Sequence, residues 1–217
     1  MTMHRPVLLS AVAALALAGV LADPAKLAVP SKTGGKSLRE CLAARHSTRS
    51  FAADPLPAGA LDQILWAADG INREDGKKRT HPSAFECYPV SIYVAQQGSV
   101  ARYDPAAHAL VPVKTEPSQD FRLAATGPSA FAKAPAILVI SVKLDAFPAK
   151  AAAELRPVWA HAECGAIGQN VYLACADLGL GTVFASAGSP EKIRDALGMP
   201  ANETPAYLMP IGVPATR

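Results

Sequence analysis

The stretch 156–178 constrains the fold more than any other part of the chain, because it predicts one long helix that must be buried. Its residues are apolar or small nearly all round, with Gly165 and Gly168 near the middle. Pro157 is typical of a first helical turn, and Gly179 of the position just after a helix. A helix that is apolar on every side is buried, and its small residues allow another backbone to approach closely. What buries it is either the core of the same chain or a second copy.

The rest of the pattern predicts a mixed α and β domain around a single core. The chain has 217 residues, half of them hydrophobic, which suffices for one ordinary domain. Residues 136–142 form an unbroken apolar run, as expected for a strand buried on both faces. Residues 90–95 and 109–113 are predicted to form a hairpin, and 207–213 a last strand. A net charge of only +3 argues against a nucleic-acid binder with a strong basic face.

Two shorter helices are predicted ahead of the strands. Ser37 and Glu40 have the spacing of a capping box, in which each side chain satisfies a backbone donor at the start of a helix. This helix should end near Arg45. The second should run from about 58 to 69, with Gly70 as a left-handed residue after its end.

The N-terminus has the pattern of an export signal. Arg5 supplies a short positive region, an apolar run follows, and small residues before Asp23 fit a cleavage site. The run is shorter than the ~20 apolar residues that span a bilayer, and an uncleaved anchor is the alternative. We therefore expect a signal peptide at 1–22, a linker at 23–36, a folded domain at 37–217, and a periplasmic or secreted protein.

The four cysteines predict neither disulfides nor a metal site. Cys164 and Cys175 are eleven positions apart in the predicted long helix. At ~1.5 Å of rise per residue they are about 16 Å apart, whereas a disulfide needs Cα atoms within about 7 Å. No Cys or His spacing is typical of zinc or thioredoxin-like chemistry.

A compact group of anion-binding side chains follows the first predicted helix. The run Arg45-His46-Ser47-Thr48-Arg49-Ser50-Phe51 holds two arginines and several hydroxyls. A guanidinium binds phosphate through two parallel hydrogen bonds and stays charged at any working pH. The other interpretation is a solvated helix end whose arginines balance the helix dipole. From these residues alone both interpretations stay open.

Several short motifs resemble those of the nitroreductase family, and they occur in the family's order. Residues 45–51 are similar to an R-x-S-x-(R/K)-x-F segment. Residues 65–73 and 79–84 resemble a helix followed by a "PSA" flavin loop. Residues 179–182 match a "GLGT" turn, and 210–214 resemble a closing "GxP" strand. Each motif is weak alone, but together they cover residues 38 to 214.

The resemblance implies an FMN-dependent oxidoreductase with an α+β fold. A central, mostly antiparallel sheet would be flanked by helices, with a long buried central helix, in a homodimer. The usual donor in the family is NAD(P)H, and the acceptor would be a small electron-poor molecule such as a nitro compound or a quinone. Few acid–base side chains are expected, because the flavin carries the hydride chemistry. We therefore name no catalytic residue. An exported enzyme would meet little NAD(P)H, so the export signal and the usual donor conflict.

The resemblance also assigns residues to the flavin. Arg45 and Ser47 would hold the phosphate and ribityl chain, and Arg49 would lie near the pyrimidine edge. Residues 82–84 would line the ring, and 181–186 would approach its other face. The cofactor-binding candidates are Arg45, His46, Ser47, Arg49, Pro82, Ser83, Ala84, Glu86, Gly181, Thr182, Ala185, Ser186 and Arg217.

Three departures keep other functions open. Many family members carry Asn where Glu86 stands and Gln where Tyr88 stands, and an ionised Glu86 cannot donate to a flavin. The Tyr88-Pro89 pair resembles the Tyr-Pro pair that is often found at this place in the branch that includes azoline-oxidising dehydrogenases. The chain stops at Arg217, soon after the last predicted strand. Arg217 would replace a basic phosphate ligand or be a frayed terminus. The alternatives are a substrate-oxidising flavin dehydrogenase and a non-catalytic flavin-binding protein.

Overall fold

The computed structural model describes residues 23–216, so the expected signal peptide at 1–22 and Arg217 lie outside the described residues. The helices are α1 (Leu38–Ala44), α2 (Ala60–Asp69), α3 (Phe121–Thr126), α4 (Arg156–Leu178) and α5 (Pro190–Leu197). The strands are β1 (Ala25–Lys26), β2 (Val90–Asp104), β3 (Ala109–Asp120), β4 (Ala136–Val142), β5 (Ala185–Ser186) and β6 (Thr204–Ile211). Short 3-10 turns lie at η1 (Ala84–Glu86), η2 (Ala130–Lys133), η3 (Leu144–Ala146) and η4 (Ala153–Leu155).

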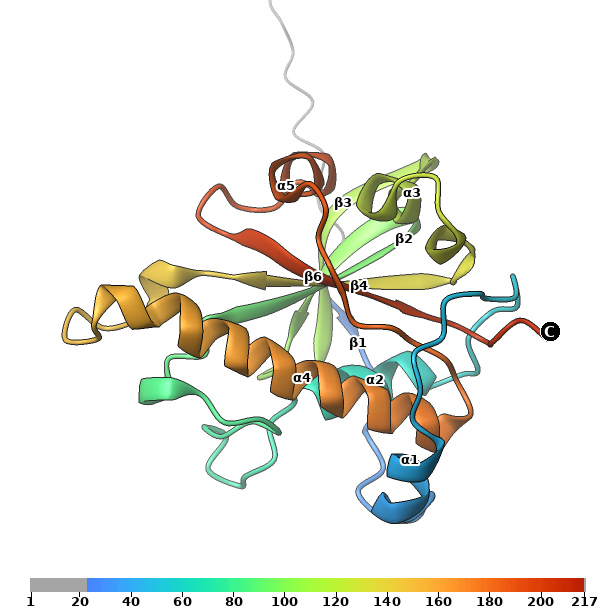
Figure 1. Cartoon of the computed structure of the whole chain (residues 1–217), viewed down its shortest axis with the longest axis horizontal. Helices are drawn as coiled ribbons and strands as arrows, with labels where there is room; N and C mark the ends of the chain where they lie inside the picture. Colours follow the sequence, from blue (N-terminus) through green and yellow to red (C-terminus); the bar gives the residue numbers. More distant parts are fainter. Residues whose placement is uncertain (1–22, 217) are drawn as a thin grey trace, which may run out of the picture.

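The strands form one sheet in the order β1-β3-β2-β4-β6-β5, and every neighbouring pair is antiparallel. Strand β4 lies inside this sheet (Figure 1), and all seven of its residues are buried. Leu138 and Ile140 pack into the core beneath α2 and α4, whereas Ile137 and Val139 pack into a second core beneath α3 and α5. The predicted burial of this strand on both faces is therefore confirmed.

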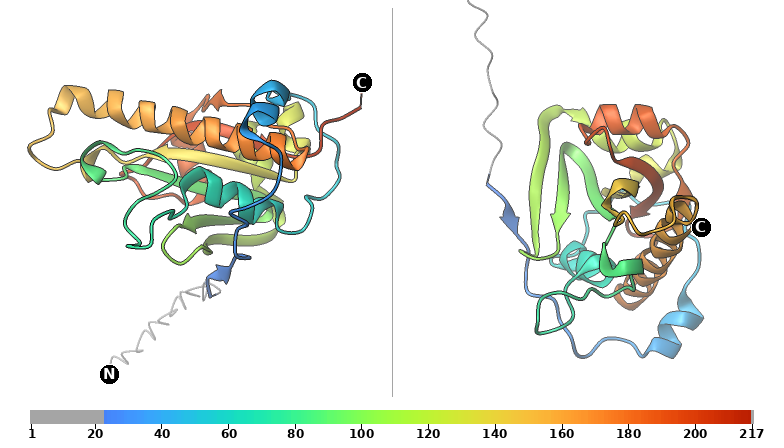
Figure 2. Two further views of the ribbon diagram at one scale, coloured as in Figure 1. Left: turned by 90° about the horizontal axis from the view of Figure 1, so that it is seen from below. Right: turned by 90° about the vertical axis from the view of Figure 1, so that its left-hand side faces the viewer.

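Helices cover both faces of the sheet. Helices α1, α2 and α4 lie on one side and α3 and α5 on the other, as the views in Figures 1 and 2 agree. Phe121 of α3 and Leu197 of α5 are fully buried against the sheet. This α+β architecture, with a mostly antiparallel sheet between helices, is the predicted fold.

Helix α4 has the predicted bounds, but a single chain buries only one of its faces. Its buried positions are Ala160, Glu163, Cys164, Ile167, Gly168, Val171 and Cys175. On the opposite stripe Val158 is 60% exposed, and Ala162, Gly165 and Gln169 are exposed as well. The expectation of burial on every side is thus met on one face only, because no described element of this chain packs on the other.

The segment 23–36 is docked on the domain. Residues 25–26 pair with β3 as strand β1. Further along, the backbone N–H of Ala28 donates to Asp62 of α2 at 2.8 Å, and that of Lys36 donates to Asp177 of α4 at 2.6 Å. These contacts bring the chain to the start of α1. No helix within residues 23–216 is long and apolar enough to cross a membrane.

Two local expectations were inaccurate. The β2–β3 hairpin extends well past the predicted strands, because its outer parts are polar and gave no hydrophobic signal. Gly70 is not left-handed, with φ −73°. It is glycine for a different reason: a Cβ there would lie 2.2 Å from the Trp66 ring. The four cysteines are free thiols; Cys41, Cys164 and Cys175 are buried and Cys87 is partly buried.

The capping box at α1 gives a test of how this helix is held. The backbone N–H of Glu40 donates to the Ser37 hydroxyl at 3.3 Å, and the N–H of Ser37 donates to the Glu40 carboxylate at 2.7 Å. Replacing Ser37 with Ala should lower the free energy of unfolding by about 1 kcal/mol in urea denaturation, because an end donor loses its partner. Ser189 is the matched control, since it precedes α5 without a side-chain cap. Ser189→Ala should change stability by less than about 0.5 kcal/mol. Equal losses in both variants would contradict the assignment.

Candidate functional site

The first group of candidate residues is positioned by the end of α1. Arg45 is the C-terminal cap of this helix, and its N–H donates to the Cys41 carbonyl at 2.9 Å. Its half-buried guanidinium lies 4.7 Å from the centre of the Tyr172 ring of α4. Such a cation–π contact holds the cation in one place while leaving its N–H groups able to donate.

The Tyr172 hydroxyl joins two candidate segments that are far apart in sequence. It lies 2.9 Å from the Ser47 hydroxyl, and it accepts a hydrogen bond from the backbone N–H of Phe184, also at 2.9 Å. Because that N–H occupies an acceptor position, the tyrosine proton is free to be donated to Ser47. Tyr172 was missed in the sequence, where it resembles one more apolar position of the long helix.

Backbone pairing brings the same two segments closer still. Ser47 and Thr182 form a parallel bridge, and the N–H of Thr48 donates to the Thr182 carbonyl at 2.8 Å. Gly181 lies so close to Thr48 that a Cβ at position 181 would be 2.7 Å from its side chain. The Thr182 hydroxyl is buried and has no hydrogen-bond partner. The structure therefore gathers Arg45, Ser47, Tyr172 and Thr182 in one place, which we call the Arg45 cluster.

Other candidates lie near this cluster with looser contacts. His46 is exposed, and its ring contacts the Ala44 carbonyl at 2.9 Å and the Thr48 hydroxyl at 3.4 Å. Arg49 is exposed. Ala185 and Ser186 form strand β5, which pairs with β6 at the edge of the sheet.

The second group of candidates lies in the loop before β2. Pro82 is exposed, and the Ser83 hydroxyl accepts a hydrogen bond from the N–H of Tyr88 at 2.9 Å. Ala84 begins the 3-10 turn η1. The carboxylate of Glu86 forms an exposed ion pair with Lys78. A cavity of about 450 Å³ lies beside this loop, lined in part by His81, Pro82, Ser83 and Tyr88.

The two groups are not brought together within one chain. The Arg45 cluster contacts α4 at Tyr172, whereas the second group lies beside Glu163. Nine residues of helix at ~1.5 Å each place these contacts about 13 Å apart along α4. One chain thus presents two separate groups of candidate residues along the same helix.

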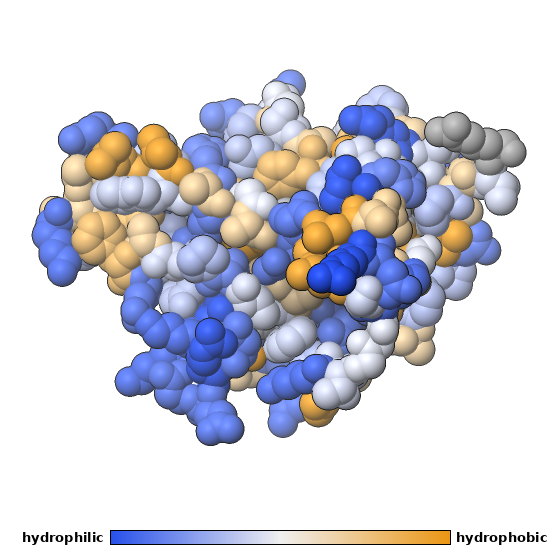
Figure 3. All heavy atoms as spheres, turned by 60° about the horizontal axis from the view of Figure 1, so that its bottom comes forward, coloured by the Kyte–Doolittle hydropathy of each residue, from blue (hydrophilic) through white to orange (hydrophobic). Residues whose placement is uncertain are grey.

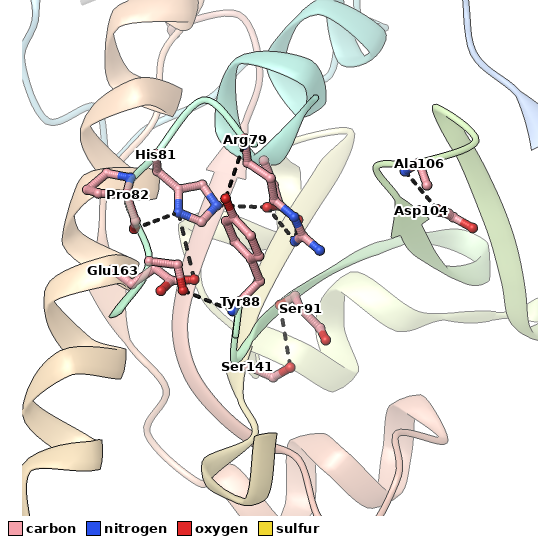
Figure 4. Close-up of polar contacts among 11 residues, drawn as sticks. Arg79, His81, Pro82, Tyr88, Ser91, Asp104, Ala106, Ser141 and Glu163 are labelled. Atoms are coloured by element: carbon pink, nitrogen blue, oxygen red, sulfur yellow. Dashed lines mark hydrogen bonds and ion pairs between the residues drawn. The ribbon is translucent and has the colours of Figure 1, made fainter. Parts of the chain in front are cut away.

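A buried polar network supports the second group (Figure 4). The Asp69 carboxylate of α2 accepts hydrogen bonds from Arg79 Nη1 at 2.7 and 2.9 Å, and His81 Nε2 lies 2.8 Å from its Oδ1. On the other side of the ring, His81 Nδ1 lies 3.7 Å from Oε1 of Glu163. Arg79 is thus tied to the domain by Asp69.

The sequence held one signal for this network. Asp69 follows Leu65 by four positions, so it lies on the apolar face of α2, where a carboxylate needs a cationic partner. Burial raises the pKa of Glu163 above its ordinary value, and the Ser83 hydroxyl and His81 partly offset this rise.

Replacing Tyr172 with Phe tests the link between the two segments of the Arg45 cluster. The change leaves the N–H of Phe184 without its acceptor, so the free energy of unfolding should fall by about 1–3 kcal/mol in chemical denaturation. Tyr207→Phe is the matched control, because the Tyr207 hydroxyl contacts His161 at the exposed surface. It should change stability by less than about 0.5 kcal/mol. A neutral Tyr172→Phe would show that this hydroxyl does not hold the segments.

Comparison with known proteins agrees with this fold and with the motifs. The nitroreductase family profile matches residues 42–213. A curated protein of Methanocaldococcus jannaschii with a provisional nitroreductase name is 35% identical over 182 residues, covering 81% of this chain and 90% of that one. A crystal structure from Ralstonia eutropha, also provisionally named a nitroreductase, has a TM-score of 0.80 and 31% identity over 92% of this chain and 97% of that chain.

A more distant structure shares the fold alone. It comes from Staphylococcus epidermidis, is provisionally named an NAD(P)H:FMN oxidoreductase, and has a TM-score of 0.61 and 15% identity over 87% of this chain and 92% of that chain. The family profile and the two relatives above 30% identity are decisive. The chain belongs to the nitroreductase family and is an oxidoreductase.

Proposed function

We propose that the protein is an FMN-dependent oxidoreductase that passes electrons from a donor such as NAD(P)H to a small electron-poor acceptor. The observation that carries this proposal is the Arg45 cluster. In it, a fixed guanidinium, the Ser47 hydroxyl and the unpartnered Thr182 hydroxyl converge from two segments that the family motifs assign to the flavin.

The chemistry of these donors fits a flavin nucleotide. Arg45 offers a permanent cation to a phosphate, and Ser47 and Thr182 offer hydroxyl groups to a phosphate or a ribityl chain. The buried Thr182 hydroxyl has no hydrogen-bond partner among residues 23–216, and buried polar groups usually have one. When bound, the flavin supplies the hydride chemistry.

The other candidate residues would position that group. Arg49 is exposed and able to turn toward the pyrimidine edge, where a cation favours negative charge. Residues 82–84 would line the ring. Glu86 is already paired with Lys78, so we do not assign it a donor role.

We also propose that the site is completed in a homodimer. The Arg45 cluster and the 82–84 loop of one chain are about 13 Å apart along α4. In a dimer, a second copy would bring its 82–84 loop to the Arg45 cluster of the first. Figure 3 shows apolar groups over the N-terminal end of α4 and over α1. Val158 of α4 and Leu38 of α1 are 60% and 63% exposed. The stripe of small residues at 162 and 165 between them would allow close helix packing.

The acceptor class is that of the family: a nitro compound or a quinone. The name of the Staphylococcus epidermidis neighbour supports NAD(P)H as donor and FMN as cofactor. The Tyr88-Pro89 pair favours the second candidate, a dehydrogenase that oxidises its substrate and passes electrons to oxygen or a carrier. Anaerobic bleaching of the flavin by NAD(P)H would support the reductase, and bleaching only by an organic substrate would support the dehydrogenase.

Replacing Arg45 with Ala should weaken FMN binding by about 1.5–3 kcal/mol, because a hydrogen bond to a charged group is lost. Flavin fluorescence titration measures this. Arg39→Ala is the matched control, since Arg39 lies exposed on the same helix, and it should leave the affinity unchanged. Equal affinity in both variants would reject the role of Arg45. A colourless wild-type protein that ignores added FMN would reject the flavin function.

Replacing Gly165 with Arg should shift the protein from dimer to monomer in sedimentation velocity, because a long charged side chain would stand on the exposed stripe of α4. A Cβ at Gly165 meets nothing within 4 Å in the single chain, so the monomer should stay folded. Gly188→Arg, at another open glycine on the loop before α5, is the matched control and should leave the dimer intact. A wild-type protein that sediments as a monomer at all concentrations would reject the dimer.

A further inference from the structure

Four ionisable side chains meet in the buried network beside the 82–84 loop. Asp69 comes from α2, Arg79 and His81 from the loop, and Glu163 from α4. The side chains of Asp69 and Glu163 are 3% exposed and that of His81 is 0% exposed. Figure 4 shows the His81 ring pointing between the other groups.

The hydrogen-bond donors and acceptors around His81 place one exchangeable proton in this network. The Asp69 carboxylate accepts from Arg79, so we assign it the acceptor role toward His81 as well, and Nε2 of His81 donates to it at 2.8 Å. The other ring nitrogen, Nδ1, faces two oxygens: the Pro82 carbonyl at 3.2 Å and Oε1 of Glu163 at 3.7 Å. Without a proton, Nδ1 would face acceptors only. A proton therefore belongs either on Nδ1 or on the Glu163 carboxyl.

Charge balance leads to the same result. With that proton, His81 and Glu163 together are neutral, and Arg79 balances Asp69. Without it, one uncompensated negative charge would be buried, which is costly. The titratable and charged groups around Glu163 and His81 are Asp69 of α2, Tyr103 of β2, Arg79 of the loop, Cys87 and Tyr88 after η1, and Cys164 of α4. Burial raises the pKa of Tyr103 and that of Cys164, so both stay neutral and do not compensate Glu163.

The network has one outlet. The Ser83 hydroxyl lowers the pKa of the nearby Glu163 carboxyl, and it accepts a hydrogen bond from the N–H of Tyr88 at 2.9 Å. Ser83 is only half-buried, and it lines the 450 Å³ cavity together with His81 and Tyr88. Oε1 of Glu163 has no hydrogen-bond partner. A hydroxyl between a buried carboxyl and an open cavity is suited to passing a proton in either direction, because it both donates and accepts.

We propose that Glu163 and His81 store one exchangeable proton and that Ser83 passes it to an acceptor bound in the adjacent cavity. This inference rests on the proposed function for its use. Two-electron reduction of a quinone needs one hydride, from the flavin reductant, and one proton. The new O–H bond forms with the proton of Ser83, whose hydroxyl takes the Glu163 proton in turn. Glu163 is left ionised and regains a proton from the cavity through Ser83. Glu163 thus acts through Ser83.

Glu163→Gln tests the store on the flavin-loaded protein, with a quinone as acceptor and Glu191→Gln on exposed α5 as the matched control. In the wild type, kcat should fall as pH rises through the raised pKa of Glu163, because only its protonated form delivers a proton. Glu163→Gln should lower kcat by about 10²-fold and abolish this pH dependence. KM and flavin content should not change, and the control should behave as wild type. Unaltered kcat and pH profile in Glu163→Gln would overturn the proposal.

Two further measurements keep the test decisive. Because burial raises the pKa of Glu163, we place the stored proton on its carboxyl rather than on Nδ1 of His81. Infrared spectra should then show the C=O band of a protonated carboxyl in wild type and Glu191→Gln but not in Glu163→Gln, whereas no such band in the wild type would overturn the store. If Glu163→Gln does not fold, Ser83→Ala should lose the pH dependence, and Ser83→Thr, which keeps the hydroxyl, should retain it. The same pH profile of kcat in Ser83→Ala and Ser83→Thr would overturn the role of Ser83 as the outlet. Flavin content separates the two proposals: a protein that binds no flavin rejects the proposed function, while a flavin-loaded Glu163→Gln with a wild-type profile rejects only the relay.

Discussion

Gly168 marks the place where α4 and the 181–186 segment touch most closely. A Cβ at this position would lie 2.6 Å from the Phe184 ring, so only glycine allows the approach. One turn further along α4, Tyr172 then reaches both the N–H of Phe184 and the hydroxyl of Ser47. The Arg45 cluster depends on this approach, because the Tyr172 hydroxyl links Ser47 to the 181–186 segment.

The two groups of candidate residues along α4 carry different kinds of charge. The Arg45 cluster holds one guanidinium, which stays charged at any working pH. At Glu163 the charge depends on protonation, and burial raises the pKa of this carboxyl. A site assembled from both groups would bind a phosphate through a cation whose charge does not change with pH. Its ability to donate a proton from Glu163 would fall as pH rises. The difference begins with the chemistry of the two groups, and burial enlarges it, because Glu163 is a buried residue of α4.

The sequence predicted the elements that carry strong periodic or apolar signals. The bounds of α4, the burial of β4 on both faces and the capping box of α1 were all predicted, because each depends on residues close in sequence. Family motifs led to Arg45, Ser47 and Thr182, which the structure brings together. The link through Tyr172 and the Asp69–His81–Glu163 network were missed. Both depend on contacts between segments more than ten residues apart, and in the sequence their members look like ordinary helix or loop positions.

The two edges of the sheet are protected against pairing with strands of other molecules. Its outermost strands, β1 and β5, are two residues long. Next to β1, the long strand β3 contains Pro112 and Pro117, which lack a backbone donor, and exposed Glu116. Proline, charge and very short edge strands are the devices by which natural sheets avoid edge-to-edge aggregation. A crowded solution of this protein should therefore resist fibrous growth through its sheet.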